Sequence, residues 1–95
     1  MSPKISVVIP VYNHAHRIGS AIDSVLAQSY QDYEILVVND GSTDDLIEVL
    51  EKFGGIKLID HETNLGRAAA RNTGVLASNG EYIAFLDADD QWMPT

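Results

Sequence analysis

The chain has 95 residues, of which 45% are hydrophobic and 21% charged, and this balance is typical of a folded domain rather than of a disordered segment. Fourteen acidic residues against six basic ones give a net charge of -8, which disfavours nucleic acid and anionic membrane surfaces as partners. The absence of cysteine excludes disulfides and thiolate metal sites and fits a cytoplasmic protein. No apolar run is long enough to cross a bilayer, so we expect no membrane insertion by this segment.

The first elements predicted along the chain are a strand, a helix and a second strand. Residues 5–9 form a β-branched run that Pro10 closes, which is typical of a buried strand. From Arg17 to Gln28 apolar side chains recur at helical spacing, which predicts an amphipathic helix. Residues 33–38 form another continuous apolar run and are predicted to be the second buried strand.

A second helix is predicted after this strand. Ser42 and Asp45 resemble a capping box, with aspartate in the position that glutamate usually takes. Apolar side chains at helical spacing then continue through residues 46–53. Because glycine favours the end of a helix, Gly54-Gly55 is predicted to stop it.

The remaining elements repeat the alternation of strand and helix. Residues 56–59 are predicted to be a third strand, residues 67–77 an alanine-rich helix, and residues 81–86 the fourth strand. Pro94 suits the first position of a further helix. Such alternation predicts an α/β fold with three layers, α/β/α, around a mainly parallel sheet. In these sheets, ligands bind beyond the carboxyl ends of the strands.

Three carboxylates follow the fourth strand directly. Asp87, Asp89 and Asp90 lie within four residues, and their mutual repulsion is relieved when a cation binds between them. Hard oxygen ligands of this kind suit Mg²⁺ or Mn²⁺. The alternative is a solvated acidic strand end with an aspartate that caps a helix, and spacing alone leaves both open.

Four loop motifs taken together resemble those of family 2 glycosyltransferases. They are Ile-Ser-Val-Val-Ile-Pro-Val-Tyr-Asn at 5–13, Val-Asn-Asp-Gly-Ser-Thr-Asp at 38–44, Asn-Leu-Gly at 64–66 with Ala-Arg-Asn at 70–72, and Asp-Ala-Asp-Asp at 87–90. The motifs occur in order over the whole chain. The resemblance implies a GT-A fold with strand order 3-2-1-4, an Mn²⁺ or Mg²⁺ cofactor held by the Asp-x-Asp motif, and usually an inverting mechanism.

The same resemblance implies a role for individual residues. Asp89 would bind the metal directly, together with Asp87. Asp40 would accept a hydrogen bond from the imide N–H of the base, or else would be a turn residue that bonds its own backbone, and both can hold together. The residues expected to contact the nucleotide-sugar are Pro10, Tyr12, Asp40, Gly66, Arg71 and Asp87.

Other side chains leave several interpretations open. Arg67 and Arg71 lie four residues apart near the start of one helix, where both would favour an anion. For Arg67 we prefer a surface ion pair. Gly66 suits a close approach of backbone to ligand, whereas Gly74 suits close packing of the helix on the sheet. The three histidines are predicted to be exposed loop or helix-start residues: His14, His16 and His61.

The function that this resemblance implies is transfer of a sugar, by default from a UDP-sugar, to an acceptor hydroxyl in polysaccharide or cell-wall synthesis. Residues 1–95 would be a single truncated nucleotide-sugar-binding domain, at work in the cytoplasm or at the cytoplasmic face of a membrane. The general base is expected beyond Thr95 and the acceptor is unknown. Two alternatives are a non-catalytic binding module that self-associates through an exposed sheet edge, and, less favoured, a phosphohydrolase.

Overall fold

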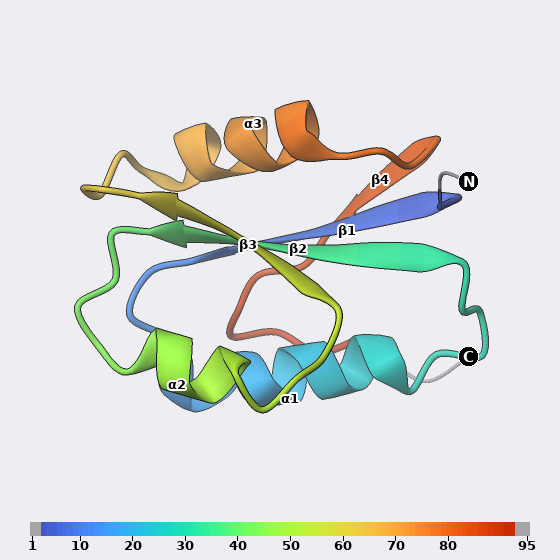
Figure 1. Ribbon diagram of the computed structural model, residues 1–95, viewed down its shortest axis with the longest axis horizontal. Coiled ribbons are helices and arrows are strands. Elements are labelled where there is room, and N and C mark those ends of the chain that lie inside the picture. Colours follow the sequence, from blue (N-terminus) through green and yellow to red (C-terminus); the bar gives the residue numbers. More distant parts are fainter. Residues whose placement is uncertain (1–2, 93–95) are drawn as a thin grey trace.

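The computed structural model describes residues 3–92 and contains a four-stranded parallel sheet between two layers of helix. The strands are β1 (Ile5–Val11), β2 (Tyr33–Asp40), β3 (Ile56–His61) and β4 (Tyr82–Phe85), in the order β3-β2-β1-β4. The helices are α1 (Ala15–Leu26), α2 (Leu46–Leu50) and α3 (Arg67–Ala77). Figure 1 shows α1 and α2 on one face of the sheet and α3 on the other. The predicted α/β class, layers and strand order are therefore confirmed.

Strand β1 does not end at Pro10, as predicted, but continues to Val11. The O of Val8 accepts a hydrogen bond of 3.1 Å from the N–H of Leu86, so the backbone groups of Val8 face β4. Two residues further along, Pro10 faces the same side, where β4 has already ended at Phe85. A proline is tolerated there because no partner strand requires its missing N–H.

The two central strands carry the core of the protein. Val7 and Ile9 of β1 are at most 1% exposed and pack toward α1 and α2, where they meet Ile18 and Ile22. Val8 points to the opposite face and joins a smaller cluster under α3. This alternation follows from the two-residue period of a strand. It makes β1 a rigid support for the loops at its carboxyl end.

Helix α3 lies close to the sheet because it presents small side chains. A Cβ added at Gly74 would collide with the side chain of Val8 on β1. Ala70 is fully buried in one cluster with Val8 and with Val38 of β2. The predicted packing role of Gly74 is confirmed. Because α3 lies so close to the sheet, two of its other residues reach the carboxyl ends of the strands. Thr73 contacts His61 at the end of β3, and Arg71 contacts Asp87 after β4.

The predicted helix boundaries need correction. Helix α1 spans Ala15–Leu26 rather than residues 17–28, and α2 ends at Leu50 rather than at residue 53. The predicted capping box is wrong, because Asp45 is the N-cap of α2 without any side-chain cap hydrogen bond. Instead, the hydroxyl of Ser42 accepts a hydrogen bond of 3.0 Å from the backbone N–H of Asn13. Ser42 therefore connects the loops after β1 and β2 rather than capping α2.

Strand β4 forms one edge of the sheet and is poorly covered. Tyr82 is 62% exposed and Phe85 45% exposed, and within residues 3–92 β4 pairs with β1 alone. Among residues 3–92, no helix is long and apolar enough to cross a membrane. Pro94, predicted to begin a further helix, lies outside the described residues.

Candidate functional site

A cleft with a volume of ≈ 260 Å³ lies at the carboxyl ends of the strands. The loops that follow β1, β3 and β4 contribute to it, together with the last residue of β2 and the first turn of α3. Its lining residues are Pro10, Val11, Tyr12, His14, Asp40, Asn64, Gly66, Arg67, Ala70, Asp87, Ala88 and Asp89. Six of the seven predicted site residues therefore share one cleft. Arg71, the seventh, lines an adjoining cavity with Phe85, Asp90 and Trp92.

Asp40, the last residue of β2, is buried, and both of its carboxylate oxygens accept hydrogen bonds from the protein. Its Oδ1 accepts a hydrogen bond from the N–H of Leu65 and its Oδ2 one from the N–H of Gly66, each at 2.9 Å. Burial acts to raise the pKa of Asp40, but the hydrogen bonds from His61, Leu65 and Gly66 outweigh it and hold the pKa below its ordinary value. The side chain is therefore a carboxylate that can only accept hydrogen bonds.

The alternative reading of Asp40, as a turn residue bonded to its own backbone, is not what the structure shows. The turn after β2 is closed by the preceding residue, Asn39, whose Oδ1 accepts a hydrogen bond of 2.9 Å from the N–H of Ser42. Both oxygens of Asp40 instead bond across to the loop after β3. Asp40 thus ties the end of β2 to the loop after β3.

His61 was predicted to be exposed, and this prediction is wrong. It ends β3, directly beside Asp40 in the register of β2 and β3, and its side chain is only 10% exposed. Nδ1 of His61 lies 2.9 Å from Oδ1 of Asp40, and Nε2 lies 2.8 Å from the hydroxyl of Thr73 on α3. Pairing the predicted second and third strands in the sequence would have placed His61 next to Asp40.

Two glycines shape the backbone around Asp40. Gly41 has a φ of +77°, and a Cβ there would lie 2.6 Å from the backbone N of Asn64, so only glycine lets the two loops approach. Gly66 has a φ of +102° and open space where a Cβ would be. Since Gly66 also lines the cleft, its backbone is accessible to a ligand.

Asp87 pairs with both arginines of α3. Its Oδ1 lies 3.4 Å from Nη2 of Arg71, and its Oδ2 lies 3.9 Å from Nη1 of Arg67. The preferred ion pair of Arg67 is present, although Arg67 also lines the cleft. Arg71 in addition lies 5.6 Å from the ring centre of Phe85. Positive charge therefore stands beside the aspartates in a protein that is strongly acidic as a whole.

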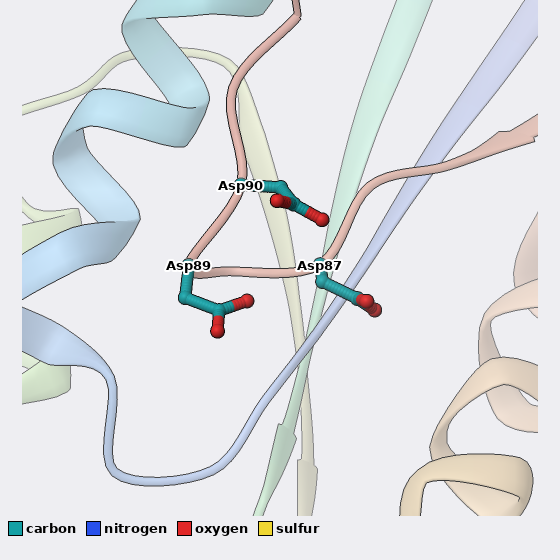
Figure 2. A group of neighbouring side chains, drawn as sticks. All are labelled: Asp87, Asp89 and Asp90. Carbon is teal, nitrogen blue, oxygen red and sulfur yellow. The ribbon is translucent and has the colours of Figure 1, made fainter.

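The three aspartates after β4 form one group of oxygen donors. One carboxylate oxygen from each of Asp87, Asp89 and Asp90 lies within 4.8 Å of the others. In Figure 2 all three side chains extend from one short loop, and that of Asp90 is directed toward Asp87, whose own side chain extends away from Asp89. Oxygens that bind one Mg²⁺ at about 2.1 Å can lie up to about 4.2 Å apart, so small rotations would suffice. The donor set fits a hard divalent cation.

Two residues of the loop after β1 have roles that were not recognised from the sequence. His14 is half-buried rather than exposed, and its Nδ1 has no hydrogen-bond partner among residues 3–92. Asn13 has a φ of 54°, and its Oδ1 accepts a hydrogen bond of 2.8 Å from the N–H of Thr43, which fixes the β1 loop against the β2 loop. Only His16 is exposed as predicted.

Comparison with known proteins identifies the family. The model of "Glycosyl transferase family 2" matches residues 6–95. The chain belongs to this family. A curated relative, the UDP-Glc:alpha-D-GlcNAc-diphosphoundecaprenol beta-1,3-glucosyltransferase WfgD of Escherichia coli, is 44% identical over 91 residues, which are 94% of this chain and 36% of WfgD.

Solved structures of glycosyltransferases share the fold. S. aureus TarS 1-349 in complex with UDP-GlcNAc superimposes with a TM-score of 0.88 at 33% identity, over 93% of this chain and 27% of TarS. The mannosyltransferase PcManGT from Pyrobaculum calidifontis, in complex with GDP-Man and Mn²⁺, gives a TM-score of 0.88 at 28% identity, over 97% of this chain and 29% of PcManGT. The chain spans between 13% and 37% of the length of the curated relatives that it matches.

Proposed function

We propose that this chain is the donor-binding half of a glycosyltransferase and binds a nucleotide-diphospho-sugar, by default a UDP-sugar. The observation that carries the proposal is a single cleft lined both by the buried carboxylate of Asp40 and by the aspartates after β4. The first provides an acceptor for a base, and the second provides ligands for a metal beside a diphosphate. The names of WfgD and of the TarS complex support a UDP-linked donor.

Base recognition is assigned to Asp40. An ionised carboxylate has no proton of its own, so it can accept the imide N–H of uracil but repels the unprotonated N3 of cytosine. Guanine also has a ring N–H. Because PcManGT was solved in complex with GDP-Man, a GDP-sugar is the alternative donor. Pro10 and Tyr12, which line the same cleft, would border the nucleotide.

Metal binding is assigned to Asp89, with Asp87 as the second ligand. A chain with a net charge of -8 repels a diphosphate unless a cation or local arginines reverse the sign of the field. Bound Mn²⁺ or Mg²⁺ would neutralise the diphosphate and stabilise it as a leaving group. Asp87 faces both Arg67 and Arg71, so these arginines would share that charge.

Transfer requires a general base as well. In an inverting reaction the acceptor oxygen attacks the anomeric carbon, its proton passes to the base, and the bond from that carbon to the diphosphate oxygen breaks. Of the cleft carboxylates, Asp40 is assigned to the nucleobase and Asp87 and Asp89 are assigned to the metal. None of them is left to take this proton. We therefore place the general base outside residues 3–92 and expect donor binding without robust transfer by the isolated chain.

Two further parts of the proposal concern the setting of the protein. The bare edge of β4, with Tyr82 and Phe85 exposed, would favour self-association of the isolated chain. A role in polysaccharide or glycoconjugate synthesis at the cytoplasmic face of a membrane agrees with the lipid-linked acceptor in the name of WfgD. The acceptor of this chain is not assigned.

Titration calorimetry with UDP tests the proposal. We expect UDP to bind in the presence of Mn²⁺ and only weakly in the presence of a chelator, because the diphosphate then meets uncompensated aspartates. Asp89→Asn should remove most of the metal-dependent binding, whereas Asp23→Asn, at an exposed position of α1, should not. Binding by Asp89→Asn equal to that of the parent chain would show that the metal ligands are wrongly assigned.

Activity assays test whether the isolated chain only binds the donor or also transfers the sugar. The purified chain is incubated with UDP-sugars, Mn²⁺ and a panel of acceptors. We expect no more than slow donor hydrolysis, because the proposal assigns no residue of 3–92 as the general base. Robust glycoside formation that depends on Asp89 would place the base within this chain.

A further inference from the structure

A chain of hydrogen bonds joins Asp40 to His61 and then to Thr73. The three residues come from β2, β3 and α3, so the network spans two strands and the helix above them. Its two contacts, Asp40 Oδ1 to His61 Nδ1 and His61 Nε2 to Thr73 Oγ1, measure 2.9 and 2.8 Å. Asp40 and His61 have side chains that are 4% and 10% exposed. Water therefore competes little for these contacts, and their geometry is set by the protein.

The direction of each hydrogen bond follows from the carboxylate. Asp40 already accepts two backbone N–H groups and has no proton to donate, so Nδ1 of His61 must carry the proton between them. In the neutral ring Nε2 is then an acceptor, and the hydroxyl of Thr73 donates to it. Asp40 thereby selects the Nδ1–H tautomer of His61, and the contact with Thr73 on the other side fixes the plane of the ring.

Counting acceptor positions shows what this arrangement leaves for a ligand. A carboxylate offers about four lone-pair positions, two on each oxygen. His61 and Leu65 occupy Oδ1, while Gly66 alone bonds to Oδ2. One position on Oδ2 is left. Without His61, each oxygen would keep one backbone partner and one open position, so either oxygen could be offered to the cleft.

We infer that His61, held by Thr73, is a positioning residue that orients Asp40 so that one oxygen faces the donor base, and that it thereby sets the preference for a base with a ring N–H. The inference rests on the proposed function of Asp40. His61 does not line the cleft, so it would act on a ligand there only through Asp40. Its effect should therefore be confined to recognition of the base and should not extend to the diphosphate.

Binding of three probes separates this role from a general structural one. UDP, CDP and inorganic diphosphate are each titrated, with Mn²⁺ present, into the parent chain and its variants. We expect the parent to prefer UDP over CDP, and we expect His61→Ala to weaken UDP about tenfold, the loss of one positioned hydrogen bond, with CDP and diphosphate nearly unchanged. His61→Asn keeps an N–H donor at the place of Nδ1 and should restore much of the preference. His16→Ala, an exposed histidine, is the matched control.

Thr73→Val and a nitrogen-15 NMR spectrum complete the test if His61→Ala folds poorly. Thr73→Val keeps the shape of the side chain but loses the hydroxyl, so it should reduce the preference for UDP to a smaller degree. In the parent chain at neutral pH, the spectrum should show the proton of neutral His61 on Nδ1, with or without nucleotide. A proton on Nε2 would overturn the inference.

The outcomes distinguish this inference from the proposed function. If the parent prefers UDP and Asp40→Ala loses the preference while His61→Ala and Thr73→Val keep it, the base assignment survives and the role of His61 is refuted. If the variants weaken diphosphate as much as UDP, His61 only maintains the fold and the inference is likewise refuted. A parent chain that binds UDP and CDP equally would refute both the base assignment and the role of His61.

Discussion

The guanidinium of Arg71 lies 3.4 Å from Oδ1 of Asp87, so a carboxylate proposed as a metal ligand already has a counter-charge beside it. This pair links α3 to the loop after β4. Arg71 is 41% exposed in its side chain and remains accessible to an anion brought in beside the aspartates. The pair therefore joins the proposed metal site to the proposed diphosphate site.

Removing the charge of Arg71 should separate diphosphate from nucleoside recognition. We expect Arg71→Gln to weaken UDP about tenfold, because a charge-assisted contact is lost, while uridine is bound as before. Calorimetry with both ligands in Mn²⁺ measures the difference, and Arg17→Gln, at an exposed position of α1, is the control. Equal weakening of UDP and uridine would indicate that Arg71 supports the fold rather than the diphosphate.

Gly74 should tolerate no side chain. A Cβ there would collide with Val8, so Gly74→Ala forces α3 away from the sheet, and we expect a loss of about 1–3 kcal/mol in the free energy of unfolding. Alanine has a higher helix propensity than glycine, so without a collision the substitution would stabilise the protein. A lower free energy of unfolding therefore indicates the collision. Urea unfolding measures it. The control is Gly54→Ala, where a Cβ meets nothing within 4 Å; stabilisation at Gly74 would contradict the packing described.

Glu34 should make stability depend on pH in the acid range. It lies at the opposite end of β2 from Asp40 and accepts hydrogen bonds from Lys57, Ser6 and the N–H of Asn79 at 2.7, 2.5 and 2.6 Å. Burial acts to raise the pKa of Glu34, but these contacts outweigh it and lower the pKa to about 2. A lowered folded-state pKa stabilises the protein above the ordinary pKa of 4.5, and this stabilisation is lost as the pH falls toward 2.

The corresponding variant is Glu34→Gln. At pH 7 we expect it to be less stable than the parent by about 2 kcal/mol, a value reduced because Lys57 is half-exposed and screened by salt. The difference should shrink as the pH approaches 2. Urea unfolding at several pH values measures this, with Glu62→Gln at an exposed position as the control. A difference that does not change with pH would mean that the charge of Glu34 is not the cause.

Much of this architecture was predictable from the sequence because its signals are local or periodic. The β-branched runs, the helical spacing and the acidic turn after β4 each lie within a few residues, and the parallel sheet then brings the loops to one edge. What the sequence missed depends on contacts between distant segments. Ser42 bonds to Asn13 rather than capping α2, and His61 is buried because β3 lies beside β2 and α3 above it. Pro10 stays within β1 because β4 ends earlier.

We propose that one cleft binds both the nucleobase and the metal-bound diphosphate. A crystal structure of the chain with UDP and Mn²⁺ tests it most directly, since the anomalous signal of manganese locates the ion. We expect Mn²⁺ on Asp89, with Asp87 nearby, the diphosphate beside it, and the uracil N–H hydrogen-bonded to Oδ2 of Asp40. Manganese bound away from these aspartates, or a uracil that makes no contact with Asp40, would contradict it.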